Sequence, residues 1–519
     1  MITNNFISRH VGPDKVQIDK MLDVLGISSI EEMMKLTMPE GIRLKEDLDL
    51  APGMNEHEYV SYMKALGAKN KLFKTYIGLG YYNTIIPGVI QRNVFENPGW
   101  YTSYTPYQAE ISQGRLEALL NFQTMISDLT GMPISNCSLL DEGTAAAEAM
   151  LMTYNCRSRE AVKRGDKKYF VSQDAFPQTI AVIKTRAHYL GIEVVVGDEF
   201  AFDFGDGFFG AFLQYPNAKG NVNDYAEFVE KAHAKNIVVA VAVDLLNMTL
   251  LTPPGEWGAD IVVGSSQRFG TPMGYGGAHA AFLATKDEYK RKMPGRIIGI
   301  TIDKFGNKAL RMSLQTREQH IKREKATSNI CTAQALMAIM AGFYAAYHGP
   351  NGLRNIARHT NILAIVLAGK LQELGYVQKN EQFCDTLNIV MPEGVCTCTV
   401  NGIALENQIN FNIISKEELS ISLDETTTIA DLNQIIAVFA KVVGKDFEPI
   451  VCKCACKCDE FSSISEKLQR KSPYLTNEVF NMYHSETDMM RYMTYLANKD
   501  LSLNRSMIPL GSCTMKLNA

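Results

Sequence analysis

The pattern of apolar and polar positions is most regular between residues 236 and 282. Residues 237–243 (IVVAVAV) form an unbroken apolar run, which predicts a strand buried on both faces of a parallel sheet and ending at Asp244. A second short strand is predicted at 259–264, and the polar turn 265–268 (SSQR) follows it. Because ligands bind outside the carboxyl ends of strands in open α/β sheets, we expect Asp244 and this turn to border one crevice.

Short apolar runs alternate with helical periodicity on both sides of this stretch. The pattern predicts strands at 169–172, 192–196 and 208–215, and helices at 115–130, 178–190, 225–234 and 333–347. This succession indicates an α/β fold with a doubly wound, mostly parallel sheet. A smaller α+β unit is expected after it, with helices at 360–374 and 429–443 and strands near 386–390, 410–414 and 419–423.

The length of 519 residues exceeds that of one ordinary domain, so we expect several folded units. The predicted parts are a helical N-terminal arm at 1–70, a large domain at 71–347, a small α+β domain at 348–448, a linker at 449–471 and a further segment at 472–519.

Charge and composition exclude several classes of function. The net charge is −4, and no basic cluster of the kind that binds nucleic acid stands out. No apolar run has the ~18 residues that a membrane span needs, and the first residues resemble neither a signal peptide nor a transit peptide. The 11 cysteines are an odd number spread through a long chain, which indicates reduced thiols. A bacterial cytoplasmic protein is therefore expected.

The layout of the central stretch resembles the large domain of pyridoxal-phosphate (PLP) enzymes of fold type I, the aspartate-aminotransferase type. In that family an Asp at a strand end pairs with the pyridine nitrogen, and a Lys at the end of the next strand forms the Schiff base. Here no lysine occurs between Lys235 and Lys286, and Arg268 stands where it is expected. An arginine cannot lose its proton to become an imine-forming amine. An ordinary ion pair between Asp244 and Arg268 remains the alternative.

The amino-acid sequence of this stretch resembles the amino-terminal half of the glycine-cleavage P-protein, the glycine decarboxylase. The resemblance lies in DLLNMTLLTPPGEWGAD (244–260) and SSQRFGTPMGYGG (265–277). P-proteins resemble two PLP-type halves in tandem, of which only the carboxyl-terminal half holds the lysine. The resemblance implies PLP-dependent decarboxylation of glycine, with transfer of the aminomethyl group to the lipoyl arm of H-protein. PLP would then be bound in the other half.

Two segments rich in tyrosine, 76–87 and 97–114, also resemble P-proteins. Gly and Pro prevent regular structure there, and the tyrosines suit the lining of a wet crevice, although packing in the core is the alternative. Tyr104, Tyr107 and Gln108 are therefore candidates for an active site shared with the other half.

Gly143 and Thr144 fall in the first turn of a predicted helix, where a PLP phosphate would rest in this fold. Together with Asp244 they are the candidate cofactor residues of this half. Asp141 and Glu142 would repel a phosphate, however, and acidic residues also cap helix starts. The sequence favours this capping role.

The four cysteines Cys452, Cys454, Cys456 and Cys458 alternate along the predicted linker. This is not the spacing of zinc or iron–sulfur sites, so we expect a linker and no metal. Beyond it, 472–492 and 501–519 resemble the opening of the catalytic half, which makes Ser512 and Thr514 further site candidates. We interpret the chain as a P-protein truncated after this opening and inactive by itself.

The expected partners follow from the resemblance. They are glycine, the lipoyl-bearing H-protein, the second P-protein half, and T-protein and lipoamide dehydrogenase as system components, in a homodimer or an α2β2 assembly. Two rival interpretations remain. One is a catalytically inactive scaffold that binds H-protein or the catalytic half; the other is an independent aminotransferase, which the lack of a lysine between Lys235 and Lys286 opposes.

Overall fold

The computed structural model describes residues 12–46, 48–103, 105–317, 319–326, 334–451 and 462–507. It divides into two compact units, one up to Phe73 and the other from Lys74 onward. The first unit contains α1 (Lys15–Leu25), α2 (Ile30–Thr37) and α3 (Glu56–Gly67). Side chains of Asp14, Ser29 and Asn55 cap these helices, and none of the three helices contains a buried residue.

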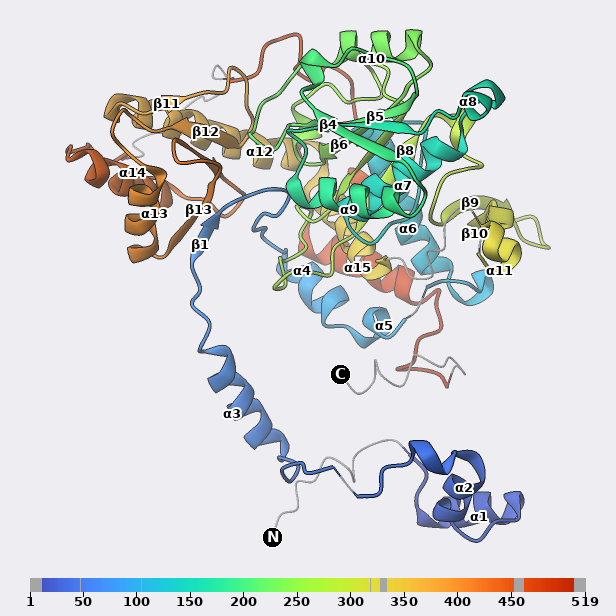
Figure 1. Ribbon diagram of the computed structural model, residues 1–519. Coiled ribbons are helices and arrows are strands. Elements are labelled where there is room, and N and C mark those ends of the chain that lie inside the picture. Colours follow the sequence, from blue (N-terminus) through green and yellow to red (C-terminus); the bar gives the residue numbers. More distant parts are fainter. Residues whose placement is uncertain are drawn as a thin grey trace. The chain divides into compact units, whose positions relative to one another are not determined.

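A seven-stranded sheet forms the centre of the second unit (Figure 1). Across the sheet the strands are β2 (Ile134–Ser135), β8 (Ala281–Thr285), β7 (Ile261–Ser265), β6 (Val238–Asp244), β5 (Phe208–Tyr215), β3 (Lys168–Ser172) and β4 (Glu193–Gly197). The five strands from β7 to β4 are parallel; at one edge β8 pairs antiparallel with β7, and β2 pairs antiparallel with β8. The predicted α/β fold with a doubly wound, mostly parallel sheet is confirmed.

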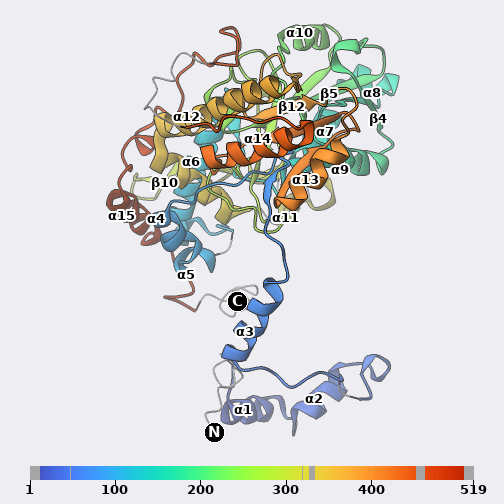
Figure 2. The ribbon, with the colours of Figure 1, turned by 90° about the vertical axis from the view of Figure 1, so that its left-hand side faces the viewer.

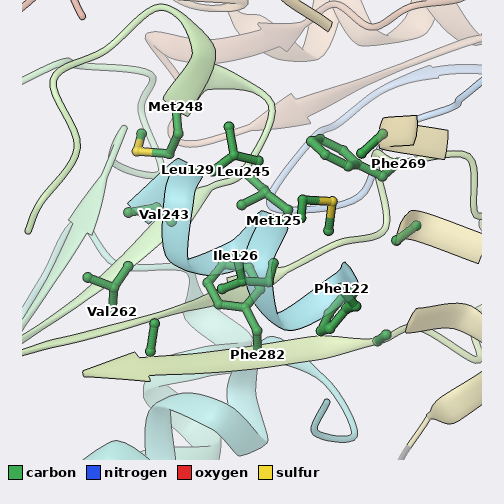
Figure 3. Packing of buried hydrophobic residues seen from close by; sticks show 14 of the residues in the cluster. Phe122, Met125, Ile126, Leu129, Val243, Leu245, Met248, Val262, Phe269 and Phe282 are labelled. Carbon is green, nitrogen blue, oxygen red and sulfur yellow. The ribbon is translucent and has the colours of Figure 1, made fainter. Parts of the chain in front are cut away.

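Helices cover both faces of this sheet. On one face α6 (Gln113–Thr130) presents Phe122, Met125, Ile126 and Leu129, at helical spacing, to apolar side chains such as Val243 on the sheet (Figure 3). On the other face lie α7 (Glu142–Asn155) and α9 (Pro177–His188). The small side chains of α7 suit close packing on the strands, so the sheet is buried on both sides as its apolar runs predicted.

A five-stranded sheet forms the smaller layer of the second unit, and α12 and α14 run in front of it in Figure 2. Its order is β1 (Lys74–Tyr76), β13 (Ile409–Ile413), β14 (Glu418–Ser422), β12 (Thr386–Val390) and β11 (Val377–Gln378). Its helices are α12 (Ala335–Leu374), α13 (Thr397–Glu406) and α14 (Ile429–Val443). Gly349 interrupts α12 with φ 65° before Pro350, so the two helices predicted on either side of residue 348 meet at a kink.

The described segment 462–507 packs back onto the seven-stranded layer. Its helix α15 (Glu486–Ala497) lies on α6, and Arg470 is buried. The Arg470 guanidinium donates hydrogen bonds to the carbonyls of Leu129 (2.8 Å) and Met248 (2.9 Å), close to the carboxyl end of α6 where a cation is favoured. The opening segment predicted from 472 thus shares the core of the large layer.

The remaining elements are short. They are α4 (Gly88–Ile90), α5 (Pro98–Tyr101), α8 (Arg159–Arg164), α10 (Ala226–Ala234), α11 (Gln319–Lys322) and the antiparallel hairpin of β9 (Ile297–Ile302) and β10 (Lys308–Ser313).

Candidate functional site

The crevice outside the carboxyl ends of β6 and β7 is closed by an ion triad. Asp244 is the last residue of β6, and Arg268 is the third residue after the end of β7. The Nη1 atom of Arg268 lies 2.8 Å from Oδ2 of Asp244 and 2.5 Å from Oδ2 of Asp385. All three side chains are almost buried. The two strand ends therefore meet as the sequence predicted, and a third residue joins them.

Asp385 directly precedes β12 of the other sheet, so the triad links the two layers. The Nδ2 atom of Asn247 donates to Asp385 at 3.0 Å, and the backbone N–H of Asn247 donates to Asp244 at 3.0 Å. Burial holds the pKa of Asp244 above its ordinary value, although the Arg268 cation opposes this shift. Buried carboxylates need such partners, because an unpaired buried charge is costly.

The Tyr82 ring lies against the guanidinium. Cζ of Arg268 is 4.0 Å from the ring centre, within the range of a cation–π contact. Gln267 fixes the backbone of Tyr82: the Tyr82 N–H donates to Oε1 (3.1 Å), and Nε2 donates to the Tyr82 carbonyl (2.7 Å). The Arg268 side chain is thus enclosed by two carboxylates and one aromatic ring.

The amino terminus of α7 is capped by carboxylate. Oδ1 of Asp141 accepts a hydrogen bond from the Thr144 N–H at 2.7 Å, which is the capping role that the sequence favoured. Burial raises the pKa of the Glu142 carboxyl to about 8, and Asp244 and Asp141 add to the rise. Gly143 and Thr144 are buried in the same turn.

The residues of this crevice do not fit PLP. A Schiff base needs a lysine, and Arg268 holds that position with its charge engaged by Asp244 and Asp385. A phosphate at the start of α7 would need the backbone N–H of Thr144, but the Asp141 carboxylate already accepts that hydrogen bond and would repel the phosphate. Gly143, Thr144 and Asp244 therefore cap and support the fold at these positions.

The tyrosine candidate Tyr107 lies in a different environment. Its side chain is 43% exposed, and its hydroxyl oxygen accepts a hydrogen bond of 2.7 Å from Nη2 of Arg296. Arg296 is buried just before β9, so a rigid element holds the phenol in place. Gln108 is exposed beside it. Tyr104, Ser512, Thr514 and the cysteines from Cys452 to Cys458 lie outside the described residues.

Sequence reasoning missed Asp385 and Arg296, whereas Tyr82 belongs to the tyrosine-rich segment 76–87 that it expected to line a crevice. Asp385 follows no strand of the large sheet, and its approach depends on how the two layers pack. Arg296 carried a weak signal, because its cation directly precedes an apolar run that begins at residue 297. Over the described ranges no three His, Cys, Asp or Glu side chains gather as metal ligands. Within the same ranges no helix has the length and apolar character to cross a membrane.

Comparison with known proteins gives consistent results. A family model described as "Glycine cleavage system P-protein" matches residues 8–439. Glycine dehydrogenase (decarboxylating) of Flavobacterium johnsoniae is 55% identical over all of this chain and 54% of its own length. The protein of that name from Bacteroides fragilis (strain ATCC 25285) is 54% identical, with the same coverage. The chain thus spans about half the length of these curated relatives.

Two solved structures support the same conclusion about fold. A glycine decarboxylase (P-protein) of the glycine cleavage system, in inhibitor-bound form, matches with a TM-score of 0.76 at 30% identity. That match covers 83% of this chain and 99% of the solved chain. A cysteine desulfurase from Thermococcus onnurineus NA1 matches with a TM-score of 0.52 at 15% identity, over 72% of this chain and 95% of its own, which shows a shared fold.

Proposed function

The chain belongs to the glycine cleavage system P-protein family, and we propose that it is the half of a glycine decarboxylase that does not hold PLP. The complete enzyme would decarboxylate glycine on PLP bound in a lysine-bearing half and transfer the aminomethyl group to the lipoyl arm of H-protein. T-protein and lipoamide dehydrogenase would act in the same system. We place the assembly in the bacterial cytoplasm, as a homodimer or as α2β2.

The observation that carries this proposal is the closed crevice at Arg268. A domain of the PLP-enzyme fold whose lysine position is filled by a paired arginine cannot form the imine that makes the α-carbon bond of glycine labile. The imine must then form elsewhere. This chain keeps the fold of a PLP enzyme without the Schiff-base lysine. That combination supports a role as the half that packs against the lysine-bearing half.

The contribution of this half to chemistry is proposed to come from its exposed polar segment. Tyr104, Tyr107 and Gln108 would line a crevice shared with the lysine-bearing half, together with Ser512 and Thr514. The Tyr107 hydroxyl oxygen accepts a hydrogen bond from Arg296, and a phenol held in this way would contact the substrate in the shared crevice. A polar group that is fixed in position can stabilise the charge that develops in a transition state.

The experiment compares the chain alone with the chain plus a lysine-bearing P-protein half. With PLP added, the chain alone is expected to show no visible aldimine band and no cofactor retained after borohydride reduction. The mixture is expected to show both, and to release CO2 from glycine when lipoylated H-protein is present. A reduced PLP adduct on a lysine of this chain would overturn the assignment. H-protein binding without CO2 release from the mixture would favour the scaffold interpretation.

A further inference from the structure

The stretch from Lys286 to Lys325 is strongly basic in an acidic chain. It contains twelve Lys and Arg against five Asp and Glu, whereas the whole chain has a net charge of −4. Part of this excess lies in the β9–β10 hairpin, where residues 300–311 carry three cations against Asp303. A cationic surface on a protein of the opposite net charge indicates a binding surface for an acidic partner.

One face of the hairpin is apolar except at its outer end, where Lys308 pairs with Ile302. Ile298 pairs with Met312 and Ile300 with Leu310 across the two strands, and side chains two residues apart share a face. The inner end of this face is buried, because Ile298, Leu310 and Met312 belong to the main core. The outer end is not: Ile300 is 62% exposed and Ile302 is 72% exposed. A core face that continues into solvent indicates an interaction site.

Cations lie on both faces of the hairpin near this end: Lys308 pairs with Ile302 on the apolar face, and Arg311 pairs with Gly299 on the opposite face. Lys304, Lys308 and Arg311 are exposed, and among the described residues none of them forms an ion pair with a carboxylate. The Lys304 ammonium lies 4.8 Å from the ring centre of Phe305, which is itself 76% exposed at the turn. The basic hairpin surface, defined as residues 300–311, therefore combines exposed apolar side chains with three cations and one carboxylate, that of Asp303.

The root of the hairpin is attached to the segment that carries Tyr107. Arg296, directly before β9, donates to the Tyr107 hydroxyl at 2.7 Å. Gln113 binds β10 through two hydrogen bonds of 2.9 Å, from its Nε2 to the Leu310 carbonyl and from the Leu310 N–H to its Oε1. Figure 1 shows the hairpin at the margin of the large layer, near α6 and α11. The surface therefore borders the polar segment assigned above to the shared crevice.

We propose that the basic hairpin surface is the docking site of the lipoyl-bearing H-protein, which meets it with an acidic face and apolar contacts. The proposal rests on the function inferred above, because only then must a carrier deliver its arm to the crevice. A carrier that docks beside Tyr107 brings its arm to the reacting atoms, whereas a carrier bound elsewhere would have to span the large layer. Exposed charges mainly steer and orient such an encounter, so binding weakens as salt rises.

The test uses the full chain and recombinant lipoylated H-protein, with binding measured by fluorescence anisotropy at about 20 and 300 mM salt. These concentrations correspond to Debye lengths of about 20 and 6 Å. The charge reversal K304E/K308E/R311E is expected to raise Kd by about tenfold or more at low salt and to remove most of its salt dependence. I302S/F305S, which keeps the charges, is expected to weaken binding at both salt concentrations.

The matched control is K163E/K167E/K184E, which reverses three lysines of the same unit on and beside α8 and α9. Its Kd should stay within about twofold at 300 mM salt, where long-range charge effects are screened. Unchanged H-protein binding by both hairpin variants would overturn the proposed docking site. The decarboxylase assignment is tested separately, by the CO2 release assay. Absence of H-protein binding by the wild-type chain would also overturn it. Altered self-association of the hairpin variants in sedimentation, with H-protein binding intact, would assign the surface to a second copy and refute the proposal.

Discussion

Two regions of the second unit differ in how they use polar side chains. At the ends of β6 and β7, Arg268 pairs through Nη1 with Asp244 and Asp385 in the interior, while its buried Nη2 atom has no hydrogen-bond partner among the described residues. At the root of β9, Arg296 instead supports Tyr107, whose side chain is 43% exposed. Each region is built around an arginine. In the first the arginine is held between carboxylates of this half, and in the second it positions a group toward the outside.

Under the function proposed above, the difference suggests how a catalytic fold can serve as a partner half. The ordinary cofactor crevice of the fold lies at strand ends, where polar groups converge. Here Arg268 stands at this place, and its ion pairs with Asp244 and Asp385 stabilise the junction of the two layers. Groups that serve chemistry must then lie where another protein can reach them. The exposed Tyr107 segment and the neighbouring basic hairpin surface meet this requirement.

Removing the central cation tests the closed region most severely. Arg268→Ala leaves the Asp244 and Asp385 carboxylates buried without a counter-ion, so the free energy of unfolding should fall by about 3–5 kcal/mol. Urea unfolding followed by circular dichroism measures the change. Arg92→Ala, which breaks an exposed pair with Glu486, should cost less than about 1 kcal/mol. Equal effects of the two substitutions would mean that the crevice is not held together by its ions.

The Glu142 carboxyl gives the closed region a pH dependence. Its pKa is raised from 4.5 to about 8, so between these values the folded chain binds a proton that the unfolded chain releases. Stability is therefore expected to fall as pH rises through this window, by up to about 1.4 kcal/mol per pH unit. Glu142→Gln keeps the shape and removes the titration. The melting temperature of this variant should exceed that of the wild type at pH 8.5 and match it near pH 5.

If the melting temperatures of Glu142→Gln and the wild type differ by the same amount at every pH in that range, Glu142 does not titrate there. Glu417→Gln, an exposed carboxyl at the surface of the small layer, serves as the control and should leave the profile unchanged.

The sequence predicted the parts of this comparison that depend on local pattern. Apolar runs located β6 and β7, and the rule for strand ends brought Asp244 and Arg268 to one crevice. Asp141 could be assigned as a cap because a helix start needs an acceptor for its free N–H groups. The alternating residues of 297–302 and 308–313, on either side of a turn with Gly306, also carried a hairpin signal that the prediction did not use.

The remaining features depend on packing between distant segments. Asp385 reaches Arg268 only because the five-stranded sheet packs against the large one. The periodicity of apolar residues predicts helices and strands, but it does not predict how two sheets pack. The antiparallel strands β8 and β2 are short apolar segments that could equally pack as core loops. The contact of Arg470 with the end of α6 likewise joins residues more than three hundred positions apart. Neighbours of this kind follow from the tertiary fold.

The smallest expected change tests the exposed region. Tyr107→Phe deletes one hydroxyl with little change of volume, in an enzyme assembled from this chain and the lysine-bearing half. If the hydroxyl donates to a developing charge, glycine decarboxylation should slow by about tenfold or more, which corresponds to about 1.4 kcal/mol. The melting temperature should change little, because an exposed hydroxyl contributes little to folding. The control is Tyr189→Phe, at a tyrosine that is 83% exposed beyond α9. Unchanged turnover, or a loss of turnover that follows a loss of stability, would return Tyr107 to a packing role.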